Sequence, residues 1–239
     1  MLNVVKRQHY VPQFYLRQFA SEVKGDNYFI KHFDKIRRVY DRANVASIAK
    51  KHKYYDVTPE QLHERGITVP ENYNPQELEH LFSTLEGDWA ILFKNISQRQ
   101  GQLEGYDEDQ INQLLKEKEK RLISEFLALQ AIRTPSWRSK WEIILGNFND
   151  AIAQSIGIDL KKSLGDMDSY YFYQHIHSGV IERLGDFFFT SFDWFLCYSP
   201  VRLYTSDNPL ARIFHLEKAR QIKDDEWPEP PYFEEYQLR

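Results

Sequence analysis

The sequence has little of what cofactor-dependent or disulfide-stabilised proteins need. Its single cysteine, Cys197, excludes a disulfide within the chain and is typical of a reducing compartment. The P-loop and Rossmann glycine patterns are missing, as are His-Glu-x-x-His, Cys-x-x-Cys and the Gly-x-Ser-x-Gly elbow. These absences remove the usual cofactor enzymes from consideration.

Long hydrophobic runs are also missing. The longest candidate, Phe187 to Tyr198, is too short to span a membrane and is interrupted by Asp193. The first residues have no signal-peptide pattern, so we expect a cytoplasmic protein that has no membrane partner.

Aromatic residues and unevenly placed charges are what the chain does have. Its 239 residues are 42% hydrophobic and 15% aromatic, which is enough for a single domain with a real core. Residues 1–53 hold twelve Lys or Arg and four Asp or Glu, whereas the remainder holds nineteen and thirty-one. Such asymmetry indicates either an anion-binding half or two surfaces of one domain that attract each other.

The hydrophobic patterns predict an α+β fold, a mainly α-helical single domain with a small antiparallel sheet from an early hairpin and late strands. We interpret 1–56 as a basic helix and hairpin, 57–223 as a helical core with late strands, and 224–239 as an acidic, proline-containing tail. The hairpin strands are expected at 27–33 and 37–40, and the late strands at 196–198 and 201–204.

Helices are predicted from apolar spacing and capping residues. Asn44 is expected to cap a short helix, and Phe187 to Phe195 are expected to lie deep in the core. The first main helix is expected to begin at Pro12. Two longer ones are expected from Asn74-Pro75 through Ile96 and from Asp107 through Ile132. Another is expected to start at Pro135, and the last is expected to cover 166–184.

Candidate functional residues begin with His9, which stands just before the helix that Pro12 starts. The N-terminus of a helix attracts anions, and Arg7 and Arg17 add charge for a phosphate or carboxylate. The alternative is that His9 and Tyr10 only close the core over the start of the helix. Further along, basic Lys51-His52-Lys53 meets Tyr54-Tyr55, a pattern of either single-stranded nucleic-acid binding or a solvated strand end.

A second set of polar residues lies on the predicted helices and in the late turn. Glu79 and Glu86 are seven apart and share a face beside the apolar stripe, where a carboxylate must be paired, protonated or metal-bound. Arg133, near Gln130, either binds free carbonyl groups at its helix end or reaches Glu79 or Glu86 as a buried ion pair. Asp207 and Asn208 lie in a turn that is either a ligand site or only an Asx-type turn.

Five runs occur together in the chain. They are HYVPQFYLRQF at 9–19, Tyr54-Tyr55, Leu78-Glu79 with Glu86-Gly87, LQAIRTP at 129–135, and Thr205 to Pro209. In this order and spacing the chain resembles, over nearly its whole length, an uncharacterised bacterial family, DUF 4238. The resemblance implies no activity, but it groups His9, Glu79, Gln130, Arg133, Asp207 and Asn208 as the polar positions that belong together.

We therefore expect a metal-dependent hydrolase, a nuclease or phosphoesterase in a bacterial defence or toxin-like role. His9 is the expected base or metal ligand, Glu79 and Asp207 are expected to hold Mg²⁺ or Mn²⁺ or to polarise water, and Arg133 is expected to stabilise phosphate charge. The basic N-terminal part attracts nucleic acid or a nucleotide. The alternative is a non-enzymatic binding or regulatory module that recognises an anionic ligand or a protein partner.

Overall fold

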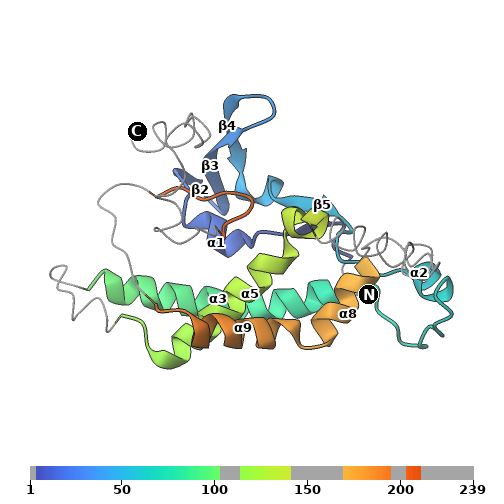
Figure 1. Cartoon of the computed structure of the whole chain (residues 1–239). Helices are drawn as coiled ribbons and strands as arrows, with labels where there is room; N and C mark the ends of the chain where they lie inside the picture. The colour runs from blue at the N-terminus through green and yellow to red at the C-terminus, as the bar shows by residue number, and fades with distance from the viewer. Residues whose placement is uncertain (1–3, 103–113, 141–168, 195–202, 211–239) are drawn as a thin grey trace, which may run out of the picture.

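Two small antiparallel sheets stand beside a bundle of helices in this computed structural model (Figure 1). The structure describes residues 4–102, 114–140, 169–194 and 203–210. The mixture of a helical majority and small antiparallel sheets confirms the predicted α+β class.

The early hairpin is formed by β3 (Asn27–Asp34) and β4 (Val39–Asn44), which pair from Phe29↔Asn44 to Asp34↔Val39. Asp34 closes its turn, because Oδ1 accepts hydrogen bonds from the backbone N–H groups of Ile36 and Arg37 at 2.9 and 3.0 Å. A short strand, β2 (Glu22–Lys24), pairs with the other edge of β3. The predicted hairpin is confirmed, with its second strand beginning two residues later than expected.

A second sheet joins two segments that the sequence did not show as partners. Strand β1 (Arg7–His9) pairs antiparallel with β5 (Lys50–His52), with Arg7 opposite His52 and His9 opposite Lys50. Between the sheets lies the 3-10 helix η1 (Val45–Ser47), whose first turn is capped by Asn44, since Oδ1 accepts from Ala46 N–H at 2.9 Å. The cap was predicted, and the helix is shorter than expected.

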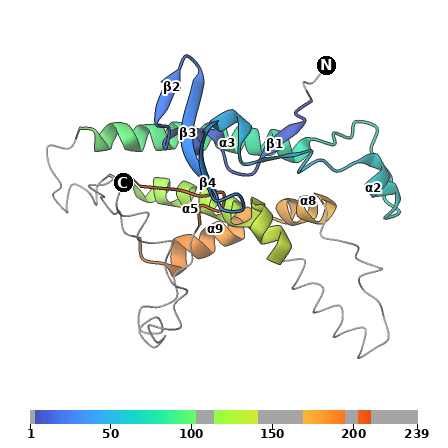
Figure 2. The same ribbon diagram turned by 90° about the horizontal axis from the view of Figure 1, so that it is seen from above.

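Three long helices form the centre of the bundle, and Figure 2 shows α5 running between α3 and α9. Their core is built from large buried side chains that include Phe82, Trp89, Phe126 and Phe172. None of the described helices combines the length and apolar character that crossing a membrane requires. The helices are α1 (Gln13–Arg17), α2 (Pro59–His63), α3 (Glu77–Gln100), α5 (Glu117–Arg133), α8 (Ser169–His177) and α9 (Val180–Ser191).

Two helix predictions were wrong in their bounds. The helix expected from Asp107 is not continuous, because residues 114–116 are not helical and α5 begins at Glu117, after the extended N-cap residue Lys116, whose N–H donates to Glu119 Oε2 at 2.9 Å. Residues 107–113 lie outside the described part of the chain. The helix expected over 166–184 is broken at Gly179, whose φ of 77° is left-handed and lets the chain turn from α8 into α9. A helix does start at Pro135, as predicted.

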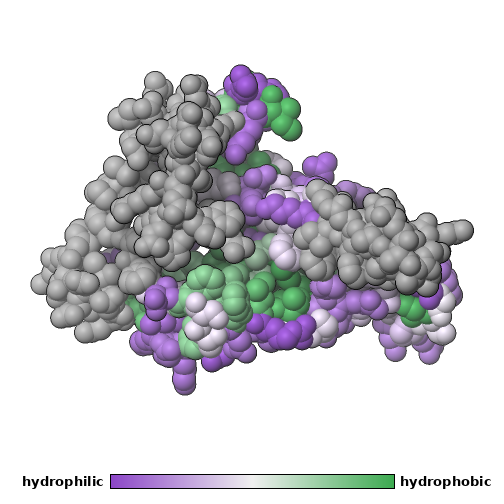
Figure 3. Space-filling model, in the orientation of Figure 1, coloured by the Kyte–Doolittle hydropathy of each residue, from purple (hydrophilic) through white to green (hydrophobic). Residues whose placement is uncertain are grey.

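The aromatic run of α9 was expected to be fully buried, and this was wrong. Phe187 is 50% exposed and Phe192 is 55% exposed, because successive aromatic residues on a helix cannot all face the same core. Figure 3 shows an apolar area over the helical bundle, while the surface around β5 is largely polar. Of the late strands, 196–198 lies outside the described residues, as does the tail, and Leu203 and Tyr204 are not in a strand.

Candidate functional site

A small cavity lies between β1, α1 and α3. Its volume is about 170 Å³, and its walls are polar apart from one aromatic ring. The lining residues are His9, Gln13, Glu79, Phe82, Ser83 and Glu86.

The periodicity of α3 explains why four of these residues face the same space. Glu79, Phe82, Ser83 and Glu86 are three, four and seven positions apart, which places them on one face of a helix. The buried Trp89 continues this side of the helix into the core. The prediction that Glu79 and Glu86 share one face of the helix is therefore confirmed.

Arg133 lies behind the cavity, at the C-terminus of α5, with only 1% of its surface exposed. Its Nη1 donates to Glu86 Oε1 at 2.8 Å, and its Nη2 donates to the backbone carbonyl of His9. The hydroxyl of Tyr55 donates to the same carbonyl at 3.1 Å. Of the two alternatives for Arg133, the structure therefore shows the inward ion pair, and the partner is Glu86.

The electrostatics of the cavity separate its two carboxyl groups. Burial, reinforced by the neighbouring charge of Glu86, raises the pKa of Glu79 from 4.5 to about 7. Arg133 opposes this rise, but it holds its ion pair with Glu86 rather than with Glu79. One carboxyl group is therefore bound to an arginine, while the other changes its charge near neutral pH.

His9 is held as a neutral imidazole. Burial, together with the positive charges of Lys50 and Arg133, lowers the pKa of His9 to about 4, although backbone hydrogen bonds at Ala46 and Val45 oppose the change. Its Nε2 is buried and has no hydrogen-bond partner within the described part of the chain. At neutral pH this nitrogen can take part in a hydrogen bond to a molecule in the cavity.

The family described as Protein of unknown function (DUF4238) matches residues 7–225. The chain belongs to this family. No curated protein and no solved structure matches it.

In this DUF4238 chain the late turn lies on the side of His9 but outside the cavity. Tyr15 and Thr205, 190 positions apart, are joined by a hydroxyl–hydroxyl hydrogen bond of 2.9 Å. Burial raises the pKa of the Tyr10 hydroxyl, and the negative charge of the nearby, exposed Asp207 raises it further. Asn208 belongs to a turn in which its backbone N–H donates to Ser206 Oγ at 3.1 Å.

The remaining predicted residues of the DUF4238 chain are dispersed. Arg7 is exposed on β1, two residues before His9, and Arg17 is exposed on α1 with its guanidinium 5.0 Å from the centre of the Tyr28 ring. Gln130 is completely buried on α5, and neither polar atom of its amide has a partner in the described structure. The cavity therefore unites His9 and Glu79, with Arg133 behind them, but not the other predicted residues.

Sequence reasoning missed Gln13, Phe82 and Ser83. Ser83 could have been found, because it lies four residues after Glu79 and so on the same helical face. Gln13 could not be predicted as a site residue, because only the packing of β1 and α1 against α3 brings it to the cavity. Within the described ranges, no group of three or more His, Cys, Asp or Glu side chains is arranged to hold a metal ion.

Proposed function

We propose that the protein is a hydrolase that cleaves phosphoester bonds and uses Glu79 as its general base. The observation that supports this most directly is the pKa of about 7 for a carboxyl group that lines a cavity. A base works best when its pKa lies near the working pH, and raising a Glu to this range is a known way to achieve it.

In the proposed reaction, ionised Glu79 takes a proton from a water molecule while the water oxygen forms a bond to phosphorus. The phosphorus–oxygen bond to the leaving group breaks, and protonated Glu79 returns the proton to the departing oxygen. The carboxylate is thereby regenerated, and one water has been consumed for each ester cleaved.

The neighbouring groups would hold this arrangement in place. Glu86, fixed by Arg133, keeps a negative charge beside Glu79 and so maintains its high pKa. Arg133 has both terminal nitrogens engaged, so we assign it a positioning role for Glu86 and His9 instead of direct contact with phosphate. His9 Nε2 would orient the attacking water.

The cavity does not fit the expected Mg²⁺ or Mn²⁺ ion, because Asp207 does not line it and Glu79 is used as the general base. The proposed reaction therefore involves no step on a metal ion. Hydrolysis of bis(p-nitrophenyl) phosphate and of a DNA or RNA oligonucleotide should be measured with each metal and with a chelator. Activity should rise with pH around 7, and Glu79→Gln should lower it by roughly 10²–10⁴-fold.

Asp88→Asn is the matched control, since it removes an exposed carboxylate from the same helix outside the cavity. It should leave the rate unchanged. Equal activity of Glu79→Gln and the unmodified protein on a substrate that is cleaved, or absence of cleavage under every condition, would refute the proposal.

A binding or regulatory module is the second candidate function. It is favoured by the same Arg133 contacts, which connect three segments and would serve a structural role without any chemistry. In that case nucleotides should raise the melting temperature, Mg²⁺ should not, and no ester should be cleaved.

We place this function in the cytoplasm of a bacterium, in a defence or toxin-like role. The single cysteine supports a reducing compartment, and a nucleic-acid hydrolase in this role would arrest growth of its own cell. Growth of bacteria expressing the protein should slow, and Glu79→Gln should remove the effect at equal protein levels.

A further inference from the structure

The positive charge of the N-terminal part is concentrated on the β1–β5 ribbon, which we define as residues 6–9 and 50–53. Of the twelve Lys and Arg residues in 1–53, five lie here: Lys6, Arg7, Lys50, Lys51 and Lys53. All four acidic residues of 1–53 lie elsewhere, between Glu22 and Asp41 in the three-stranded sheet. The ribbon therefore contributes five of the eight net positive charges of this part.

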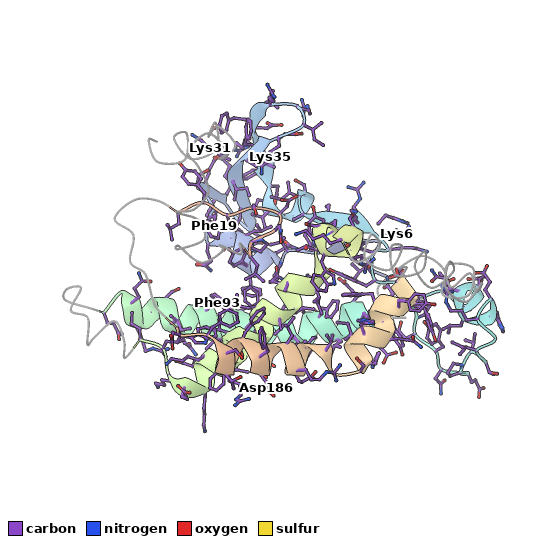
Figure 4. The ribbon with its side chains drawn as sticks, viewed as in Figure 1. Lys6, Phe19, Lys31, Lys35, Phe93 and Asp186 are labelled. Carbon is purple, nitrogen blue, oxygen red and sulfur yellow. The ribbon has the colours of Figure 1, made fainter. Side chains whose placement is uncertain are left out.

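Acidic residues accompany the cations of the three-stranded sheet, whereas the ribbon contains none. Glu22 binds Lys24 at 2.9 Å and Arg42 at 2.7 Å. None of the ribbon cations forms a salt bridge within the described residues, and all except the half-buried Lys50 are exposed. Figure 4 shows how far Lys6 lies from Lys31 and Lys35 on the hairpin.

One face of the ribbon leads directly to the cavity. Arg7 and His9 alternate along β1 and stand opposite His52 and Lys50, so these four side chains share a face. The positive charge of Lys50 helps to lower the pKa of His9, whose imidazole lines the cavity. A chain of negative charges lying on this face would therefore reach the proposed reaction centre.

The chemistry of the ribbon fits a phosphate backbone better than a protein surface. Its exposed side chains are all charged or imidazole, without the apolar centre that protein interfaces need. A phosphate backbone requires only cations. Tyr54 is 92% buried under Arg138, 3.7 Å from ring centre to guanidinium carbon, so base stacking on it is not the means of binding.

We infer that the β1–β5 ribbon binds the phosphate backbone of a nucleic acid and delivers it to the cavity of Glu79. The delivery step depends on the proposed function, but binding does not. The two can therefore fail separately.

The test measures binding of a fluorescent single-stranded oligo(dT) at several salt concentrations. The variant Arg7→Gln/Lys51→Gln/Lys53→Gln removes three exposed ribbon charges, Arg7 from the face described above and Lys51 and Lys53 from the residues beside it. It spares Lys50, whose Nζ donates to the Ala46 carbonyl at 2.5 Å. The slope of log affinity against log salt should become shallower by about 2, with at least tenfold weaker binding at 0.1 M salt. The matched control, Lys31→Gln/Lys35→Gln/Arg37→Gln, removes the same charge from the hairpin and should have a small effect.

The ribbon variant should still cleave bis(p-nitrophenyl) phosphate, which is too small to use the ribbon. Glu79→Gln should still bind oligo(dT) while losing cleavage, so failure of catalysis leaves the binding result intact. Undiminished binding by the ribbon variant, an equal loss in the hairpin control, or equal affinity for polyglutamate would overturn the inference.

Discussion

Glu79→Gln should stabilise the protein, and more so as the pH rises. A carboxyl group with a higher pKa in the folded protein binds more protons when folded, so its contribution favours folding at low pH and is lost as pH increases from 4.5 to about 7. The full change is equivalent to at most about 3.4 kcal/mol. Glu79 is only partly buried, so solvent screening reduces the expected gain to roughly 1–2 kcal/mol above pH 7.

The assay is thermal unfolding of the unmodified protein and the variant at pH 5, 6, 7 and 8. For a chain of 239 residues, the melting temperature of Glu79→Gln should exceed that of the unmodified protein by about 2–8 °C at pH 8. At pH 5 the difference should be much smaller, because Glu79 is then protonated in the folded protein and already about one quarter protonated in the unfolded chain.

The control is Asp88→Asn, which should follow the unmodified protein at every pH. A melting-temperature difference for Glu79→Gln that does not change between pH 5 and pH 8 would show that Glu79 titrates like an ordinary carboxyl group. The proposed general base would then lose its physical support.

Three further predictions concern the surroundings of the cavity and the helices. Arg133→Met leaves Glu86 without its partner and should destabilise the protein by about 3–5 kcal/mol in urea unfolding; a loss below about 1 kcal/mol would contradict a buried ion pair. Gln130→Met replaces a buried amide without partners, so it should leave the stability unchanged or raise it by about 1 kcal/mol, and clear destabilisation would mean that the amide is bonded in solution. Gly179→Ala should cost about 1 kcal/mol, because a φ of 77° strains any other residue, and a stabilised variant in the same urea assay would argue against this turn.

Local signals in the sequence predicted much of the fold. Asn44 was identified as a cap from its position before a short helix, and the β3–β4 hairpin from alternating residues on either side of Asp34. The pairing of Arg133 with Glu86 was one of the alternatives, since a buried carboxylate on α3 needs a cation. Each of these depends on residues whose neighbours along the chain restrict what they can do.

Long-range placement could not be predicted in the same way. β1 and β5 are three residues each and carry no apolar alternation, so nothing marked them as partners. Asp207 was expected at the cavity because polar turns often hold ligands, but the hydrogen bond between the hydroxyl groups of Tyr15 and Thr205 holds this turn near Tyr10. The prediction that the aromatic run containing Phe187 is buried was wrong, because hydrophobicity does not determine which side of the helix faces the core.

The hydrogen bond between Arg133 and the His9 carbonyl has a consequence for biosynthesis. The two residues are 124 positions apart, and a ribosome adding about 5–20 residues per second needs roughly 6–25 s to travel between them. Throughout that interval the cationic first strand has been synthesised, but its guanidinium partner has not. A nascent chain stalled before codon 133 should therefore expose the first strand to proteolysis, and one released beyond the helix end should protect it.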